Sequence, residues 1–220
     1  MNTMPLIKLK NAIGNEVNHT AKTFYTMDID CNETKDAIYK ESNNAKFSKC
    51  DTDFLIDYII KTHHAFAKKN AIIIYNLTQK VAYRHSHEHN ELKKFNEVAF
   101  FFFQDLLNQM LREELNLFPY LGQTIRNIIH AGKNDEATLQ YLKEKIQLQQ
   151  AEHEKSFNYL KMFREITSDY QIPVDACNHY KSLFEKMKEL EHDLTMHFYL
   201  EDNILFRNAI ADDKELIGEH

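Results

Sequence analysis

Apolar side chains recur every three or four residues along most of the chain after residue 50. This is the spacing of amphipathic α-helices. Turn-forming residues are scarce, because the whole sequence contains only four glycines and three prolines. Long elements with few breaks indicate an all-α fold. The pattern predicts four long helices, at about residues 54–85, 91–121 with an extension towards 130, 135–168 and 176–211.

Short polar segments separate these helices. "HSHEHNELKKF" indicates a turn after the first helix, and "HAGKND" combines a helix-ending Gly132 with Asn134 or Asp135 as the next N-cap. Pro119 predicts a bend in the second helix, and Pro173 marks the turn before the fourth. Long helices with short connections are typical of an up-and-down four-helix bundle. Two helical hairpins packed together are the rival arrangement.

Residues 1–50 have a different character. They are polar and rich in Asn and Lys, with short helical candidates near 15–26 and 33–40. "KESNNAKFSKCDTD" indicates a linker that ends in a helix cap. We therefore expect a small helical N-terminal domain and linker at 1–50, followed by the bundle at 51–220.

Charge and cysteine usage narrow the class of protein. The net charge is −6 and the pI is about 6.1, with no basic run, which argues against nucleic-acid binding. The first residues lack an apolar core of signal-peptide length, and no window is apolar enough to cross a membrane. Cys31, Cys50 and Cys177 are an odd number without a CxxC motif. We therefore expect reduced thiols and a cytoplasmic location.

Two segments share one pattern: "QMLREELNLF" at 109–118 and "HFYLEDNILF" at 197–206. Each has a polar residue, a carboxylate four positions later, a second carboxylate, and a final Leu-Phe. Because positions four apart lie on one helix face, His197 and Glu201 are suited to bind one metal ion. Glu113 holds the matching carboxylate position, and the other two helices carry His64 and His153. Inward ligands from facing helices are typical of helical di-iron proteins.

Axial position tests this arrangement. Glu113 and His153 lie almost equally far from the turn near Gly132, so they are expected at one height. His153 and His197 match less well across the next turn. The fourth helix must therefore begin lower, or its connection must run down the side of the bundle.

With these residues the chain resembles the RIC (repair of iron centres) family, which are hemerythrin-like di-iron proteins with a small N-terminal domain. The similarity is strongest in "FLIDYIIKTHHAF", "REELNLFPYL", "QLQQAEHEKSFNYL" and "LTMHFYLEDNILFRNAI". The resemblance implies a hemerythrin-like bundle in which Glu113 and Glu201 bridge two irons. The implied metal ligands are His64, Glu113, His153, His197 and Glu201. His85 also matches a family histidine, for which we expect a channel role, a supporting role or a surface position.

The sequence departs from the family pattern in three places. Gln109 stands where the family has a histidine, and a neutral amide oxygen is a poorer ligand for iron than imidazole. A single iron is therefore the alternative to a di-iron centre. Cys31 stands alone where the family has paired cysteines, so a structural role is expected for it. Arg207 replaces the proline of the last Leu-Phe-Pro motif.

The resemblance implies repair of iron–sulfur clusters damaged by nitrosative or oxidative stress. The protein would act as an iron donor, as an NO- or O2-reactive centre, or as both. Iron–sulfur proteins would accept the iron, and the chain would be a monomer or a homodimer. One alternative is a hemerythrin-like O2 or NO binding or sensing protein without iron transfer. Another is a bundle that has lost its metal and serves as an interaction module. Whether the protein is an enzyme is left open.

Neighbouring residues are expected to be structural. Adjacent helix positions point about 100° apart, so His63 is expected to face away when His64 faces inward. His87, His89 and His192 are expected at the surface. The four phenylalanines at 100–103 are expected to pack in the core, with a dimer surface as the alternative.

Overall fold

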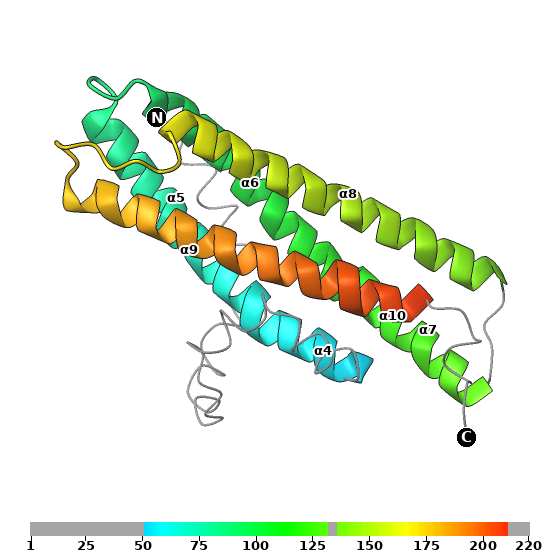
Figure 1. The fold of residues 1–220 in the computed structure, drawn as a ribbon. Coiled ribbons are helices and arrows are strands. Elements are labelled where there is room, and N and C mark those ends of the chain that lie inside the picture. Colours follow the sequence, from blue (N-terminus) through cyan, green and yellow to red (C-terminus); the bar gives the residue numbers. More distant parts are fainter. Residues whose placement is uncertain (1–50, 132–135, 211–220) are drawn as a thin grey trace, which may run out of the picture. The chain divides into compact units, whose positions relative to one another are not determined.

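The computed structural model describes residues 51–131 and 136–210, which form four long helical rods (Figure 1). The first rod is α4 (Thr52–Tyr58), the π-helical η1 (Ile59–His64) and α5 (Ala65–His85). The second is α6 (Glu91–Arg112), the π-helical η2 (Glu113–Leu117) and α7 (Phe118–Ala131). The third is α8 (Glu136–Thr167). The fourth is α9 (Asn178–Leu200), the π-helical η3 (Glu201–Leu205) and α10 (Phe206–Ile210).

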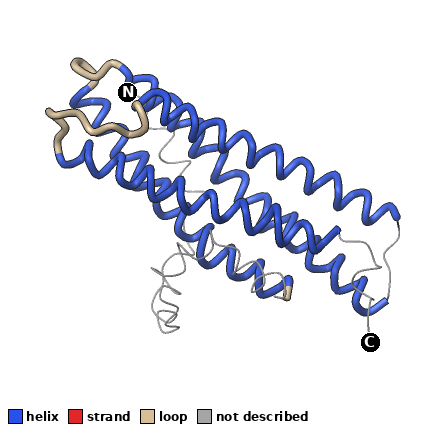
Figure 2. The backbone as a smooth tube through the Cα atoms, viewed as in Figure 1, coloured by secondary structure: helices blue, strands red, loops and turns tan. Residues whose placement is uncertain are grey.

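The rods run alternately up and down, and no strand occurs in the described ranges (Figure 2). Helix α5 packs against α6 and α9, and α6 packs against α8. The predicted all-α bundle is therefore confirmed, and its helix limits lie within a few residues of those expected. The predicted N-terminal domain, which includes Cys31, lies outside the described residues and stays a prediction. The same holds for the turn signals at Gly132–Asp135.

Aromatic side chains fill the core. Phe95 and Phe102 pack on Phe163 with ring centroids 4.7 and 5.4 Å away. Of the phenylalanine run, Phe102 and Phe103 are buried, whereas Phe101 is 57% exposed. Four consecutive helix positions cover every side of the rod, so only part of the run can face inward. The core prediction therefore holds for part of the run.

The connection between α8 and α9 resolves the axial mismatch. Ser168, Asp169 and Tyr170 all have φ between 50 and 59°, which ends α8 in three left-handed residues. Such residues cost about 1–2 kcal/mol each, and burial of the Tyr170 ring against Phe184 offsets part of this. The connection then extends past the end of α8 before α9 begins (Figure 1). This lower start brings His197 level with His153.

Truncation of the phenylalanine run tests the observed helix orientation. Phe102→Ala removes a fully buried ring and should lower the free energy of unfolding by about 3–5 kcal/mol. Phe101→Ala, one position away, should lower it by less than about 1 kcal/mol. Urea unfolding followed by circular dichroism measures both changes. Equal losses for the two variants would contradict the orientation of α6 described here.

Candidate metal centre

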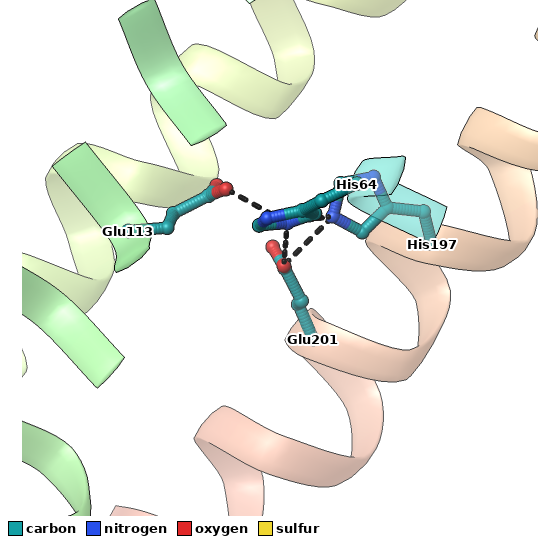
Figure 3. A group of neighbouring side chains, drawn as sticks. All are labelled: His64, Glu113, His197 and Glu201. Carbon is teal, nitrogen blue, oxygen red and sulfur yellow. Dashed lines mark hydrogen bonds and ion pairs between the residues drawn. The ribbon is translucent and has the colours of Figure 1, made fainter. Parts of the chain in front are cut away.

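Four ionisable side chains from three rods converge inside the bundle. His64 is the last residue of η1, Glu113 opens η2, His197 lies near the end of α9, and Glu201 opens η3. One ligand atom from each lies within 4.8 Å of the others, and all four residues are fully buried. Figure 3 shows them pointing toward one another, with His197 and Glu201 on the same rod. The predicted convergence of His64, Glu113, His197 and Glu201 is therefore present.

The geometry of this group fits a metal ion. Nε2 of His64 lies 2.9 Å from Nε2 of His197, and two imidazole lone pairs at that distance repel unless a proton or a cation lies between them. Nε2 of His197 lies 2.8 Å from Oε1 of Glu201. Among the described residues, the Oε2 atoms of Glu113 and Glu201 face only imidazole nitrogens, Nε2 of His64 at 3.2 Å and Nε2 of His153 at 2.9 Å. Each of these nitrogens also lies 3.6 Å from an oxygen of the other carboxylate, so a cation at this point would compensate the buried oxygens more fully.

His153 of α8 approaches the same carboxylates from the other side. Its Nε2 lies 2.9 Å from Oε2 of Glu201 and 3.6 Å from Oε1 of Glu113. Gln109 donates an amide hydrogen bond to Oε1 of Glu113 at 3.0 Å, and Gln149 donates to the same oxygen. The side of the centre facing α8 therefore holds one imidazole and two carboxamides.

Gln149 was missed from the sequence, although a signal existed. It lies four residues before His153, the same spacing that joins Gln109 to Glu113 and His197 to Glu201. Its side chain is buried, with Nε2 3.2 Å from Nε2 of His153. Apart from this spacing, a glutamine between exposed residues carries no signature, so packing was needed to show that it faces the centre.

The second carboxylate of each repeated segment supports a histidine from a neighbouring rod. Nδ1 of His64 lies 2.6 Å from Oε1 of Glu114, and Nδ1 of His153 lies 3.0 Å from both oxygens of Asp202. Lys68 in turn donates to Glu114 at 2.6 and 2.7 Å. A carboxylate on Nδ1 orients the ring and directs Nε2 to the centre. This explains why the two segments share adjacent carboxylates.

His63 corrects an expectation. It was expected to face away from the interior, but it is only 5% exposed, and its Nδ1 lies 3.0 Å from Oδ1 of Asp193. Its ring stacks on His197 at a centroid distance of 5.8 Å. Both His63 and His64 lie in the π-helical η1, whose wider turn places adjacent side chains closer in direction than an α-helix does. The α-helical estimate of their separation therefore failed.

Three π-helical segments meet the centre. Segment η1 ends at His64, η2 begins at Glu113, and η3 begins at Glu201. π-Helical turns are rare and are frequently found at functional sites. Within the two repeated segments, EELNL and EDNIL adopt the same π-turn, and each turn begins at the buried carboxylate, Glu113 or Glu201. Their common pattern is therefore a common backbone feature.

The histidines predicted to lie at the surface or in a supporting role are found there only in part. The exposed His87 and His192 match the surface prediction, and His89 is partly buried. His85 lies at the far end of α5, where it is 9% exposed and its Nε2 is 3.1 Å from Sγ of Cys177. It is therefore neither beside the centre nor on the surface.

Electrostatics balance the buried carboxylates. Burial alone would lower the pKa of His64, but Glu113, Glu114 and Glu201 raise this pKa well above its usual value. Burial likewise opposes protonation of His153, yet Asp202, Glu113 and Glu201 raise its pKa to about 11. Burial would raise the pKa of Glu201, but imidazoles, that of His197 first, lower it well below its usual range. Protons on two imidazoles therefore offset two carboxylates, and a metal ion would replace protons.

No family model matches the chain. It is similar to the iron-sulfur cluster repair protein ScdA of Staphylococcus epidermidis, with 27% identity over 216 residues that cover 95% of this chain and 82% of the relative. It is also similar to the iron-sulfur cluster repair protein YtfE of Escherichia coli O157:H7, with 26% identity over 159 residues that cover 72% of this chain and 66% of the relative.

These relatives confirm the predicted resemblance to repair-of-iron-centres proteins. The centre agrees with it at the level of residue type, since imidazole and carboxylate donors suit iron and other first-row divalent metals. Among the described helices, none is both long and apolar enough to cross a membrane.

Removing the supporting carboxylates should weaken metal binding without removing a ligand. Glu114→Gln and Asp202→Asn each leave the donor atoms in place but loosen an imidazole, so iron affinity should fall about 10- to 100-fold. Asp57→Asn is the matched control, because Asp57 pairs with the exposed Lys61 on the rod that carries His64. Competition with a chromogenic chelator measures the affinities. A loss in the control equal to that in Glu114→Gln would contradict the role assigned to Glu114.

Proposed function

We propose that the protein is a non-haem iron protein that repairs damaged iron–sulfur clusters by supplying iron. One observation carries the proposal: His64, Glu113, His197 and Glu201 place their donor atoms at a single buried point. The names of ScdA and YtfE support this function. The recipients are iron–sulfur proteins, and the widely spaced cysteines favour a cytoplasmic location.

The centre favours one firmly held iron. Two imidazoles and two carboxylates surround the point near His64 and His197. On the opposite side, the amides of Gln109 and Gln149 direct N–H groups at Glu113, where a second cation would otherwise compensate the carboxylate. Among the residues that the structure describes, His153 is the only imidazole on that side. A second iron is therefore weakly bound or lost, and Glu113 and Glu201 serve chiefly one metal.

Glu114 and Lys68 form one edge of the centre that reaches solvent, and Asp202, with a side chain 25% exposed beside His153, forms another. The side chains of Glu114 and Lys68 are 19% and 30% exposed, whereas the ligands beside them are fully buried. Glu114 also lines a surface pocket of about 180 Å³ with Ile60 and Phe118. We propose that NO, O2 or an iron acceptor reaches the centre from this side. Iron held by these residues would be the group with which a small ligand reacts.

Transfer of iron to an acceptor tests the function. Iron-loaded protein incubated with an apo iron–sulfur protein should restore the cluster absorption of the acceptor when sulfide and reductant are present. His197→Ala should lose iron and abolish restoration. His179→Ala, which changes an exposed histidine of the same helix, should restore it fully. Reversible NO or O2 binding by the iron-loaded protein, with no restoration, would favour the carrier alternative instead.

Gln109→His tests the number of irons. An imidazole at this position adds a ligand beside Glu113 and His153, so iron content should rise from about one towards two per chain. Loss of iron to an excess of chelator should slow. Gln104→His is the control, since it places a histidine at an exposed position of α6. Metal analysis and Mössbauer spectra measure the outcome, and unchanged iron content would contradict the proposed role of the amide.

A further inference from the structure

Four potential ligands gather at the end of α5 opposite the iron centre: His85, His89, Asp175 and Cys177. His85 and His89 are four residues apart, and the backbone N–H of His89 donates to the carbonyl of His85 at 2.8 Å. The helical turn therefore continues to His89 and places both imidazoles on one side. Asp175 and Cys177 are two residues apart in the connection that leads to α9.

The donors already form two close pairs. Nε2 of His85 lies 3.1 Å from Sγ of Cys177, and Nε2 of His89 lies 3.1 Å from both carboxylate oxygens of Asp175. Nitrogen and sulfur on one tetrahedral Zn²⁺ lie about 3.5 Å apart, and nitrogen and oxygen about 3.3 Å apart. Both pairs are closer than this, at hydrogen-bonding distance, so each must open slightly to admit an ion.

The surroundings resemble those of a built metal site. The buried ring of Tyr180 packs against His85 and His89, with centroids 5.4 and 5.6 Å away. Oε1 of Glu91 lies 3.2 Å from Nδ1 of His89, which directs the other ring nitrogen toward Asp175. Cys177 is the N-cap of α9, so its sulfur lies beside the first turn of a long helix.

One adjustment closes the site. The centroids of His85 and His89 are 6.4 Å apart, whereas two imidazoles on one tetrahedral ion are about 5 Å apart. His89 and Asp175 are the more exposed half, with side chains 17% and 55% exposed, whereas His85 is held in the interior at 9% exposure. The two pairs do not yet meet at one point, so binding of an ion requires rotation of His89 and Asp175 toward His85 and Cys177.

We propose that His85, His89, Asp175 and Cys177 bind a borderline-soft divalent cation such as Zn²⁺, independently of the iron centre. Two imidazoles, one thiolate and one carboxylate are ligands that Zn²⁺ accepts in tetrahedral sites. The ion would tie the end of α5 to the connection between α8 and α9. This connection carries the three left-handed residues that end α8.

Cobalt tests the site in the full-length chain, because Co²⁺ bound by a thiolate gives a charge-transfer band that imidazole and carboxylate ligands do not give. A Cys31→Ser, Cys50→Ser variant leaves Cys177 as the only cysteine. With the iron centre already loaded, one equivalent of Co²⁺ should produce the band, and Zn²⁺ should abolish it. Adding Cys177→Ser should eliminate it, and adding His89→Ala should weaken Co²⁺ binding at least about tenfold.

The controls separate a metal site from a hydrogen-bonded pair. His87→Ala changes an exposed histidine of the same turn and should leave Co²⁺ affinity unchanged. Zn²⁺ should also protect Cys177 from alkylation in the folded protein, and His89→Ala should remove that protection. A normally helical protein without the band at one equivalent of Co²⁺ would overturn the proposal. Equal affinity in His89→Ala would overturn it as well, leaving a thiol–imidazole contact beside a surface ion pair.

Discussion

Compensation of two buried carboxylates is the constraint on which the centre of the bundle depends. Glu113 and Glu201 are fully removed from water. An isolated carboxylate in such surroundings is strongly destabilising, so each needs positive charge or hydrogen-bond donors nearby. Imidazoles from three of the rods supply them: His64, His153 and His197. The rods must therefore meet at one height, and the connection between α8 and α9 is shaped to allow this.

The compensation is arranged in tiers. Carboxylates at the centre contact imidazoles, and two of those imidazoles contact outer carboxylates, Glu114 and Asp202. Lys68 then pairs with Glu114 near the surface. The outer carboxylates orient the imidazole rings of His64 and His153. Negative and positive groups therefore alternate from the buried centre to the partly exposed Lys68. Glu114 and Lys68 are partly exposed, and Glu114 lines the surface pocket, which is why we propose that the centre is approached from this side.

The two repeated segments are alike in backbone but unlike in chemistry. Both place a carboxylate pair at the start of a π-turn. In one segment, the imidazole of His197 contacts Glu201 one turn further along the helix. In the other segment, Gln109 donates an amide hydrogen bond to Glu113. One half is therefore built to hold a cation, while the other half already satisfies its carboxylate. This asymmetry underlies the proposal of one firmly held iron.

The sequence by itself determined the four helices, because apolar spacing and scarce turn residues are local properties of the chain. Spacing by four placed His197 and Glu201 on one helix face, and the resemblance to the iron-repair family implied that His64, Glu113 and His153 converge with them. Only the tertiary structure decided what surrounds them. The inward position of His63 depends on the π-turn of η1, and Gln149 and the Glu114 and Asp202 contacts depend on packing between rods. The pairing of His85 with Cys177 joins residues 92 positions apart. Contacts between distant segments leave no period in the sequence, so they become visible only when the rods are packed.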